Sequence, residues 1–234
     1  MSVAVRDLHY AYEDGAPALN GITFSVAQGE RVALIGPNGA GKSTLLLGLV
    51  GLLRGRGEIE IDGLLLGDDT LRGIRARCGL VFQNPDDQLF SPSVYEDVAF
   101  GPVHLKLTPD EVSTRVGDAL AAVGLGGFEQ RVPHHLSVGE KKRVALATVL
   151  AMKPGLLLLD EPSAGLDPRG RGELLGLLRT LPQTMLVSTH DLRLVAALAD
   201  RTLVLEGGRI AADGPTAKVL ADAALLRAHG LEEG

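Results

Sequence analysis

Aromatic side chains and cysteine are scarce in this sequence. Only 3% of the 234 residues are aromatic and none is tryptophan, which disfavours the base-stacking surfaces of single-strand nucleic-acid binders. The formal net charge of −6 also argues against a nucleic-acid partner. Cys78 has no second cysteine to pair with, so an internal disulfide is excluded and we expect a small buried hydrophobe in a strand.

Long apolar runs are missing as well. The longest, residues 45–53, is interrupted by Gly48 and Gly51 and is shorter than the roughly 20 residues that a membrane-spanning helix needs. Any membrane connection is therefore expected to run through a partner. The hydrophobic fraction of 45% and the charged fraction of 22% are ordinary for a globular domain that buries a sizeable core.

The order of the apolar segments predicts an α/β fold. Alternating or β-branched segments at 3–5, 22–26 and 58–61 predict strands near the N-terminus. Short apolar runs at 31–35, 78–82, 156–159 and 185–188 are separated by helical stretches, the first of them at 43–53. This alternation is typical of a parallel sheet with helices on its faces.

The middle of the chain, residues 84–150, has a different pattern. Residues 108–111 form a capping box with proline at the first helical position, and apolar residues then recur at helical spacing from Val112 to Val123. We expect a helical subdomain inserted into the α/β core. Near the end, residues 202–211 predict a hairpin that turns at 207–208, and residues 217–229 predict a final helix.

A glycine-rich turn follows the apolar run 31–35 and opens the helix predicted from Ser43. Its pattern, Gly36-x4-Gly41-Lys42-Ser43, allows consecutive backbone N–H groups to point at phosphate oxygens, and the helix N-terminus adds a favourable dipole. Lys42 is expected to reach the β- and γ-phosphates, and the Ser43 hydroxyl to ligate Mg²⁺. The predicted phosphate-binding residues are Gly36, Pro37, Asn38, Gly39, Ala40, Gly41, Lys42, Ser43 and Thr44. Kinases, GTPases and ATPases all remain possible on this motif alone.

Polar residues end three other apolar strands. Asp160 and Glu161 follow the run 156–159, where Asp160 can hold Mg²⁺ through a water and Glu161 can polarise the attacking water. His190 and Gln83 fall at the same carboxyl edge of the sheet, where open α/β sheets bind ligands. His190 can bond the γ-phosphate, and Gln83 can ligate Mg²⁺ or orient water. Taken alone, Asp160 and Glu161 could equally be a surface acid pair, His190 a structural histidine and Gln83 a residue of a solvent-facing turn.

Residues 136–140 precede a helical stretch at 141–152. Ser137 and Glu140 have capping-box spacing, which by itself indicates only a helix start. A capped and positively polarised helix N-terminus is, however, also an anion site.

In this order the motifs resemble those of the ABC transporter ATPases, over about residues 3–227. The resemblance implies that Tyr12 stacks on adenine, that Gln83 is the Q-loop glutamine and that His190 is the H-loop histidine. Asp160 and Glu161 match the Walker B motif. The signature matches Leu136, Ser137, Val138, Gly139 and Glu140, and the D-loop matches Ser163, Ala164, Gly165, Leu166 and Asp167. ATP and Mg²⁺ are the implied cofactors.

The implied fold is a RecA-like P-loop NTPase core with an N-terminal antiparallel β subdomain and an inserted α-helical signature subdomain. The whole chain, 1–234, would be one such domain, with the core at about 1–83 and 151–215, the helical part at 84–150 and a C-terminal helix at 216–234. The sequence departs from the family at Val138, where glycine is usual and a β-branched side chain narrows φ and ψ, and at Glu140, where glutamine is usual.

In this family the signature of one subunit closes over the nucleotide held by another. Because the chain carries one signature and one phosphate loop, we expect two chains to pair head to tail around two ATP molecules. Ser137, Val138, Gly139 and Glu140 would then contact the nucleotide in trans. The partner is a second copy or a close paralogue, and the sequence does not choose between them.

Residues 83–90 and 96–102 are similar to the ATPases of energy-coupling factor (ECF) importers, which take up vitamins and transition-metal ions. Residues 140–145 and 151–154 favour the cobalt and nickel branch. The resemblance implies a transmembrane coupling subunit and a substrate-binding membrane subunit, at the cytoplasmic face of the membrane. Leu89 and Phe90, apolar in a polar segment, are expected to dock the coupling helices.

Three alternatives stay open on the sequence. They are an ECF ATPase for a vitamin, the ATPase of another ABC importer or exporter, and a non-transport ABC ATPase that acts on ribosomes or DNA. The adjacent His134 and His135 are not predicted to bind metal, because neighbouring side chains of an extended segment point in opposite directions.

Overall fold

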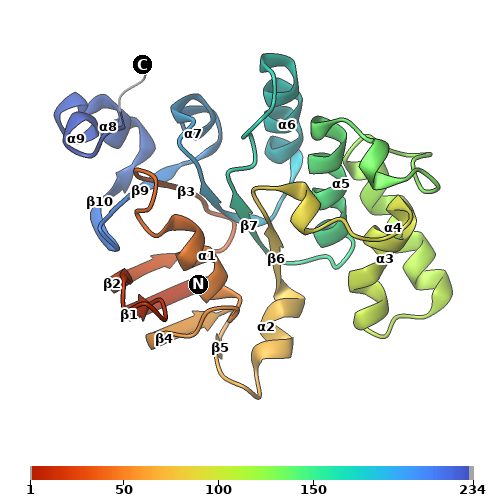
Figure 1. Cartoon of the computed structure of the whole chain (residues 1–234), viewed down its shortest axis with the longest axis horizontal. Helices are drawn as coiled ribbons and strands as arrows, with labels where there is room; N and C mark the ends of the chain where they lie inside the picture. The colour runs from red at the N-terminus through yellow and green to blue at the C-terminus, as the bar shows by residue number, and fades with distance from the viewer. Residues whose placement is uncertain (1, 232–234) are drawn as a thin grey trace.

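Two β-sheets organise residues 2–231, the part of the chain that the computed structural model describes (Figure 1). One sheet is antiparallel, with strand order β2-β1-β4-β5. The other has the order β10-β9-β3-β8-β7-β6 and is parallel except between β9 and β10. The strands are β1 (Val3–Ala11), β2 (Pro17–Val26), β3 (Arg31–Ile35), β4 (Arg56–Ile61), β5 (Leu64–Leu65), β6 (Cys78–Val81), β7 (Leu156–Asp160), β8 (Thr184–Ser188), β9 (Arg201–Glu206) and β10 (Arg209–Pro215).

The helices fall into groups along the larger sheet. In Figure 1, α3, α4 and α5 gather at one end of the molecule, and α8 and α9 lie at the opposite end. The α-helices are α1 (Lys42–Leu49), α2 (Leu71–Arg77), α3 (Val94–His104), α4 (Pro109–Ala122), α5 (Val138–Leu150), α6 (Pro168–Thr180), α7 (Leu192–Leu198), α8 (Thr216–Ala221) and α9 (Ala223–Ala228). Two short 3₁₀ turns are η1 (Pro85–Asp87) and η2 (Pro133–His135).

Strand β7 is buried on both faces of the sheet, which accounts for its continuous run of leucines. All of its residues are buried, and successive side chains point to opposite faces. Leu157 and Leu159 join the core that includes α3, α4 and α5. Leu156 and Leu158 join the core between the two sheets, which includes α1. The strand is therefore held from both sides, and this fixes where the acids at its end lie.

The structure corrects several predicted boundaries. The helix expected at 43–53 ends at Leu49, because Gly51 takes a left-handed φ of +65° and closes the helix. The strand expected at 78–82 ends at Val81. The strands expected at 3–5 and 22–26 are the starts or ends of longer strands, Val3–Ala11 and Pro17–Val26.

The single helix expected at 217–229 is wrong. It is broken at Asp222, whose ψ of 84° is not helical and whose carboxylate accepts a hydrogen bond from the Leu225 N–H at 2.9 Å. This cap starts α9 as a separate helix. The last three residues of the predicted C-terminal helix, 232–234, lie outside the described part of the chain. The hairpin predicted at 202–211 is confirmed as β9 and β10.

Candidate functional site

The loop between β3 and α1 needs glycine at both of its ends. A Cβ atom on Gly36 would collide with the carbonyl of Leu205, and one on Gly41 would collide with the carbonyl of Ala18. Gly41 also has a φ of +104°, a left-handed value that residues with side chains rarely adopt. The backbone of the loop can therefore pass close to β2 and β9 while its N–H groups remain available to an anion.

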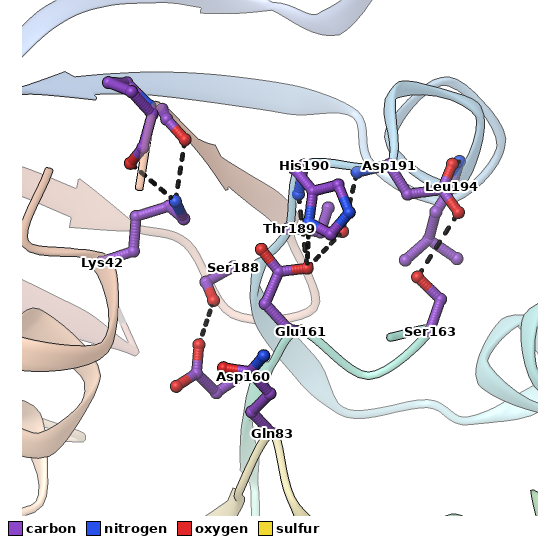
Figure 2. Close-up of polar contacts among 12 residues, drawn as sticks. Lys42, Gln83, Asp160, Glu161, Ser163, Ser188, Thr189, His190, Asp191 and Leu194 are labelled. Carbon is purple, nitrogen blue, oxygen red and sulfur yellow. Dashed lines mark hydrogen bonds and ion pairs between the residues drawn. The ribbon is translucent and has the colours of Figure 1, made fainter. Parts of the chain in front are cut away.

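Lys42 lies across this loop. Its buried ammonium donates hydrogen bonds to the carbonyls of Gly36 at 2.8 Å and Pro37 at 3.1 Å (Figure 2). Burial lowers the pKa of Lys42, and the nearby carboxylates of Glu161 and Asp160 partly offset that by raising it. A cation held at the mouth of a helix N-terminus is suited to bind phosphate oxygens.

A cleft of about 740 Å³ lies over the loop and gathers most of the predicted nucleotide-binding residues. Ala16, Pro17 and Ala18 and the C-terminal Gly230 and Leu231 complete its wall. The predicted residues that line it are Tyr12, Gly36, Pro37, Asn38, Gly39, Ala40, Gly41, Lys42, Ser43, Thr44, Gln83, Glu161 and His190.

Tyr12 is held at the edge of this cleft by two contacts. Its hydroxyl is hydrogen-bonded to the Thr44 hydroxyl at 2.8 Å, and its ring meets Tyr10 edge to face with centroids 5.2 Å apart. The ring stays exposed. An exposed aromatic face in a fixed place suits stacking on a planar base.

Glu161 turns the chain directly after β7 with a φ of +44°. This left-handed backbone conformation is strained in a residue other than glycine and costs about 1–3 kcal/mol. Its N–H donates to the Ser188 carbonyl at 2.9 Å, which holds the turn against β8. Its buried carboxylate lies 2.9 Å from His190 Nδ1 and accepts a bond from the Thr189 hydroxyl at 3.3 Å (Figure 2). The carboxylate is thus oriented from two sides.

Asp160 lies one residue earlier, still within β7. It is buried and accepts a hydrogen bond from the Ser188 hydroxyl, its register partner on β8. Together with Gln83 it lines a second cleft, of about 450 Å³, next to the first. Hydroxyl, amide and carboxylate oxygens are the donors that Mg²⁺ prefers, so Ser43, Gln83 and Asp160 fit this ion chemically.

Three residues near the site were not identified from the sequence. They are Ser188 and Thr189, which contact Asp160 and Glu161, and Lys142, which lies between the loops that follow β6 and β7. The position of Ser188 and Thr189 directly before His190 was the available signal. Lys142 gave none, because its neighbours in space are far away in the chain.

The signature and D-loop segments form a separate cleft of about 380 Å³. Ser137 caps α5: its hydroxyl accepts from the Glu140 N–H at 3.3 Å, while the Glu140 carboxylate accepts from the Ser137 N–H at 2.8 Å. Hydrogen bonds from the Ser137 hydroxyl and N–H lower the pKa of Glu140. Val138 is the first helical residue of α5, and its exposed side chain lies beside Gly165.

The signature cleft shares no lining residue with the cleft over the phosphate loop. Within one chain, Ser137, Gly139 and Glu140 thus lie away from the cleft over the phosphate loop, whereas Val138 also lines the 450 Å³ cleft that holds Gln83 and Asp160. The D-loop residues Gly165, Leu166 and Asp167 line the signature cleft. Asp167 also caps α6 by accepting the Gly170 N–H at 2.7 Å, and the Ser163 hydroxyl bonds Asp191 at 3.4 Å.

The sequence profile of the ABC transporter family matches residues 19–164, more than half of the chain. The chain belongs to the ABC transporter family. The ATPases of this family hydrolyse ATP with Mg²⁺, and this chain is an ATP hydrolase coupled to transport. No helix within residues 2–231 is long and apolar enough to cross a membrane.

Similar proteins place this ABC ATPase more narrowly. The energy-coupling factor transporter ATP-binding protein EcfA of Methanothermobacter thermautotrophicus is 51% identical over 98% of the chain and 76% of its own length. The structure of cbiO1 from Clostridium perfringens, part of the ABC transporter complex cbiONQ, has 41% identity and a TM-score of 0.85 over 98% of this chain and 94% of that one.

A third relative is an ATP-binding cassette whose dimeric, post-hydrolysis structure contains ADP and phosphate. It has 29% identity and a TM-score of 0.80, covering 92% of this chain and 98% of that one. These neighbours confirm the predicted fold, a P-loop NTPase with an antiparallel β-sheet beside the parallel-rich one.

Proposed function

We propose that this ATPase powers an ECF-type importer for a transition-metal ion such as cobalt or nickel. The observation that carries the proposal is the likeness to cbiO1 over nearly the full length of both chains, joined with the similarity to EcfA. The similarity to EcfA also suits the alternative, an ECF ATPase that serves a vitamin importer.

An exposed apolar patch on α3 and the segment before it supports a membrane partner. Phe90, Phe100 and Val103 are 63%, 48% and 56% exposed, and the two phenylalanine rings meet edge to face with centroids 5.3 Å apart. Phe100 also packs on the ring of His104, 4.2 Å away. Contiguous apolar groups on a surface mark interaction sites. We infer that this patch docks a helix of the transmembrane coupling subunit. Leu89, expected from the sequence to share this role, is instead buried in the core.

Asp97 keeps the docking patch in shape. Its buried carboxylate accepts hydrogen bonds from the N–H groups of Phe90 at 3.1 Å and Ser91 at 2.9 Å. The loop that carries Phe90 is thereby attached to α3, which carries Phe100. Force applied by a docked helix would reach α3 and α5 together, because these helices pack on each other.

The hydrolysis site is proposed to work as follows. Lys42 and the loop from Gly36 to Thr44 hold the phosphates, and Tyr12 stacks on the adenine. Ser43, Gln83 and Asp160 hold Mg²⁺, which supplies charge neutralisation at the phosphates. Glu161 draws a proton from the attacking water, and His190 orients Glu161 and bonds the γ-phosphate. A second chain supplies Ser137, Val138, Gly139 and Glu140, and closure of the pair moves the docked membrane helices.

The docking proposal is tested by weakening the patch without touching the nucleotide cleft. A double variant, Phe90→Ser with Phe100→Ser, is expected to lose co-purification with membrane subunits and to keep ATP binding. The matched control, Leu52→Ser with Leu65→Ser, removes apolar side chains that are exposed elsewhere and should keep the partners.

The substrate is tested on the intact membrane complex purified through this chain. Elemental analysis that finds bound cobalt or nickel supports the metal importer. A bound vitamin with no metal contradicts it and favours the vitamin alternative. Recovery of ribosomes or DNA, lost at high salt, would instead support a non-transport ABC ATPase.

A further inference from the structure

Lys142 is a buried cation that none of the roles above requires. It lies in the second turn of α5, five residues after the signature serine, and only 5% of its surface is exposed. Lysine is almost never fully buried unless its ammonium has partners. Burial lowers the pKa of Lys142, and the charges of Glu161 and Asp160 partly offset that.

The partners of Lys142 are two backbone carbonyls in two different loops. Its Nζ donates to the carbonyl of Gln83 at 2.9 Å and to the carbonyl of Glu161 at 3.3 Å. Gln83 follows β6 and Glu161 follows β7, so both carbonyls belong to the carboxyl edge of the sheet. The bonds are made to the main chain and leave the side chains of Gln83 and Glu161 available for the reaction.

The neighbouring lysine shows that this arrangement is particular to Lys142. Lys141 instead pairs its ammonium with the carboxylate of Asp86 in η1 at 2.7 Å. Because Asp86 is exposed to solvent, this ion pair is expected to contribute little. Removing the buried ammonium of Lys142, in contrast, would leave its two carbonyl partners without a hydrogen-bond donor.

We propose that Lys142 is a positioning residue that ties the signature helix α5 to the turns of Gln83 and Glu161. The inference rests on the proposed role of Glu161 in hydrolysis. Because α5 begins at the signature and is a rigid helix, a shift of the signature moves Lys142 by a comparable distance. Both carbonyls then follow, so the geometry of the hydrolysis site depends on the position of the helix that contacts the opposite nucleotide.

The test compares Lys142→Met with Lys141→Met, the same substitution one residue away on the same helix. Lys142→Met is expected to lower kcat about 10- to 100-fold with KM for ATP nearly unchanged, because a misplacement near 1 Å is costly at a reacting centre. Lys141→Met should stay within about twofold of the unmodified protein. Melting temperature and ATP affinity, measured for each, separate misfolding from mispositioning.

A double-variant cycle with Glu161→Gln gives the readout that a merely structural role would not move. If Lys142 acts through Glu161, adding Lys142→Met to Glu161→Gln lowers the single-turnover hydrolysis rate by less than about twofold. Lys142→Arg, which keeps the charge and the donors, should recover part of kcat. If Lys142→Met fails to fold, Lys142→Gln takes its place in the cycle.

Two results would overturn the inference: an unchanged kcat for Lys142→Met, or an equal fold loss with and without Glu161→Gln. A failure of the proposed function is read separately, from the Glu161→Gln protein alone. If that protein hydrolyses ATP at the normal rate, the role of Glu161 is wrong whatever Lys142 does.

Discussion

At the scale of single residues, the acid at the end of β7 carries the most specific chemistry. Glu161 occupies a strained backbone conformation, and its carboxylate is directed by His190 and Thr189. Strain of this kind persists only where the surroundings determine the conformation, and it is concentrated at functional sites. Asp160, one residue earlier, is instead bonded to Ser188 and keeps an ordinary strand geometry. The two acids therefore have distinct environments and are expected to do distinct work.

Glu161→Gln is predicted to bind ATP but to hydrolyse it about 10²–10⁴ times more slowly, because the amide keeps the shape of the side chain and cannot accept the proton from water. Phosphate release measures the rate, and binding of a fluorescent ATP analogue measures the affinity. Glu58→Gln, an exposed acid on β4, is the control and should change neither. Near-normal turnover by Glu161→Gln would remove the role assigned to this residue.

At the scale of elements, all three helices of the α3 to α5 group begin with the same capping box. Ser93 and Glu96 start α3, Thr108 and Glu111 start α4, and Ser137 and Glu140 start α5, with reciprocal hydrogen bonds in each. The backbone bond and the hydroxyl bond from Thr108 lower the pKa of Glu111, as the bonds from Ser137 do for Glu140. The caps are alike physically, but only the one on α5 stands in the signature cleft.

The caps of α4 and α5 permit a matched experiment. Ser137→Ala and Thr108→Ala are both predicted to lower the melting temperature by about 2–4 °C through the lost cap. Only Ser137→Ala should also slow ATP hydrolysis, since only Ser137 is proposed to contact nucleotide. Equal hydrolysis rates in the two variants would leave Ser137 with no function beyond capping.

The same caps predict a pH dependence of stability. Because the folded-state pKa of Glu140 lies below its ordinary value of 4.5, its contribution is present above that pH and is lost as pH falls through the lowered pKa. The melting temperature, measured between pH 7 and strong acid, should therefore depend less on pH in Ser137→Ala than in the unmodified protein.

At the scale of the whole molecule, the phosphate loop and the signature of one chain are predicted to belong to two different nucleotide sites. The phosphate loop and the signature lie in clefts with no lining residue in common, and α5 and α1 belong to different cores. Ser137 of the signature consequently lies outside the cleft over the phosphate loop of its own chain. A second chain, placed head to tail, would supply the missing half at both sites.

The hydrolysis-deficient protein Glu161→Gln is predicted to dimerise when Mg²⁺ and ATP are added at high protein concentration, and to revert when ATP is removed. Size exclusion with light scattering measures the mass. Adding Lys42→Met, which removes the cation proposed to hold the phosphates, should abolish the dimer. A persistent monomer would show that one copy of this chain does not complete the site of another, and would favour a paralogous partner.

The parts of this protein that follow local backbone rules were predictable from the amino-acid sequence alone. A phosphate loop needs glycines at set spacing after a buried strand, and Gly36 and Gly41 meet that need within one short segment. Acids directly after the leucine run of β7 could likewise be placed at the sheet edge, because parallel strands end together.

The contacts between groups that are distant in the chain could not be predicted in this way, because they depend on how the elements pack. Ser188 reaches Asp160 through the register of β7 and β8, and Lys142 reaches Gln83 and Glu161 through the packing of α5 on the sheet. Contacts of this kind depend on the relative placement of whole elements. That placement is set by the burial of both faces of the sheet, and no local sequence pattern encodes it.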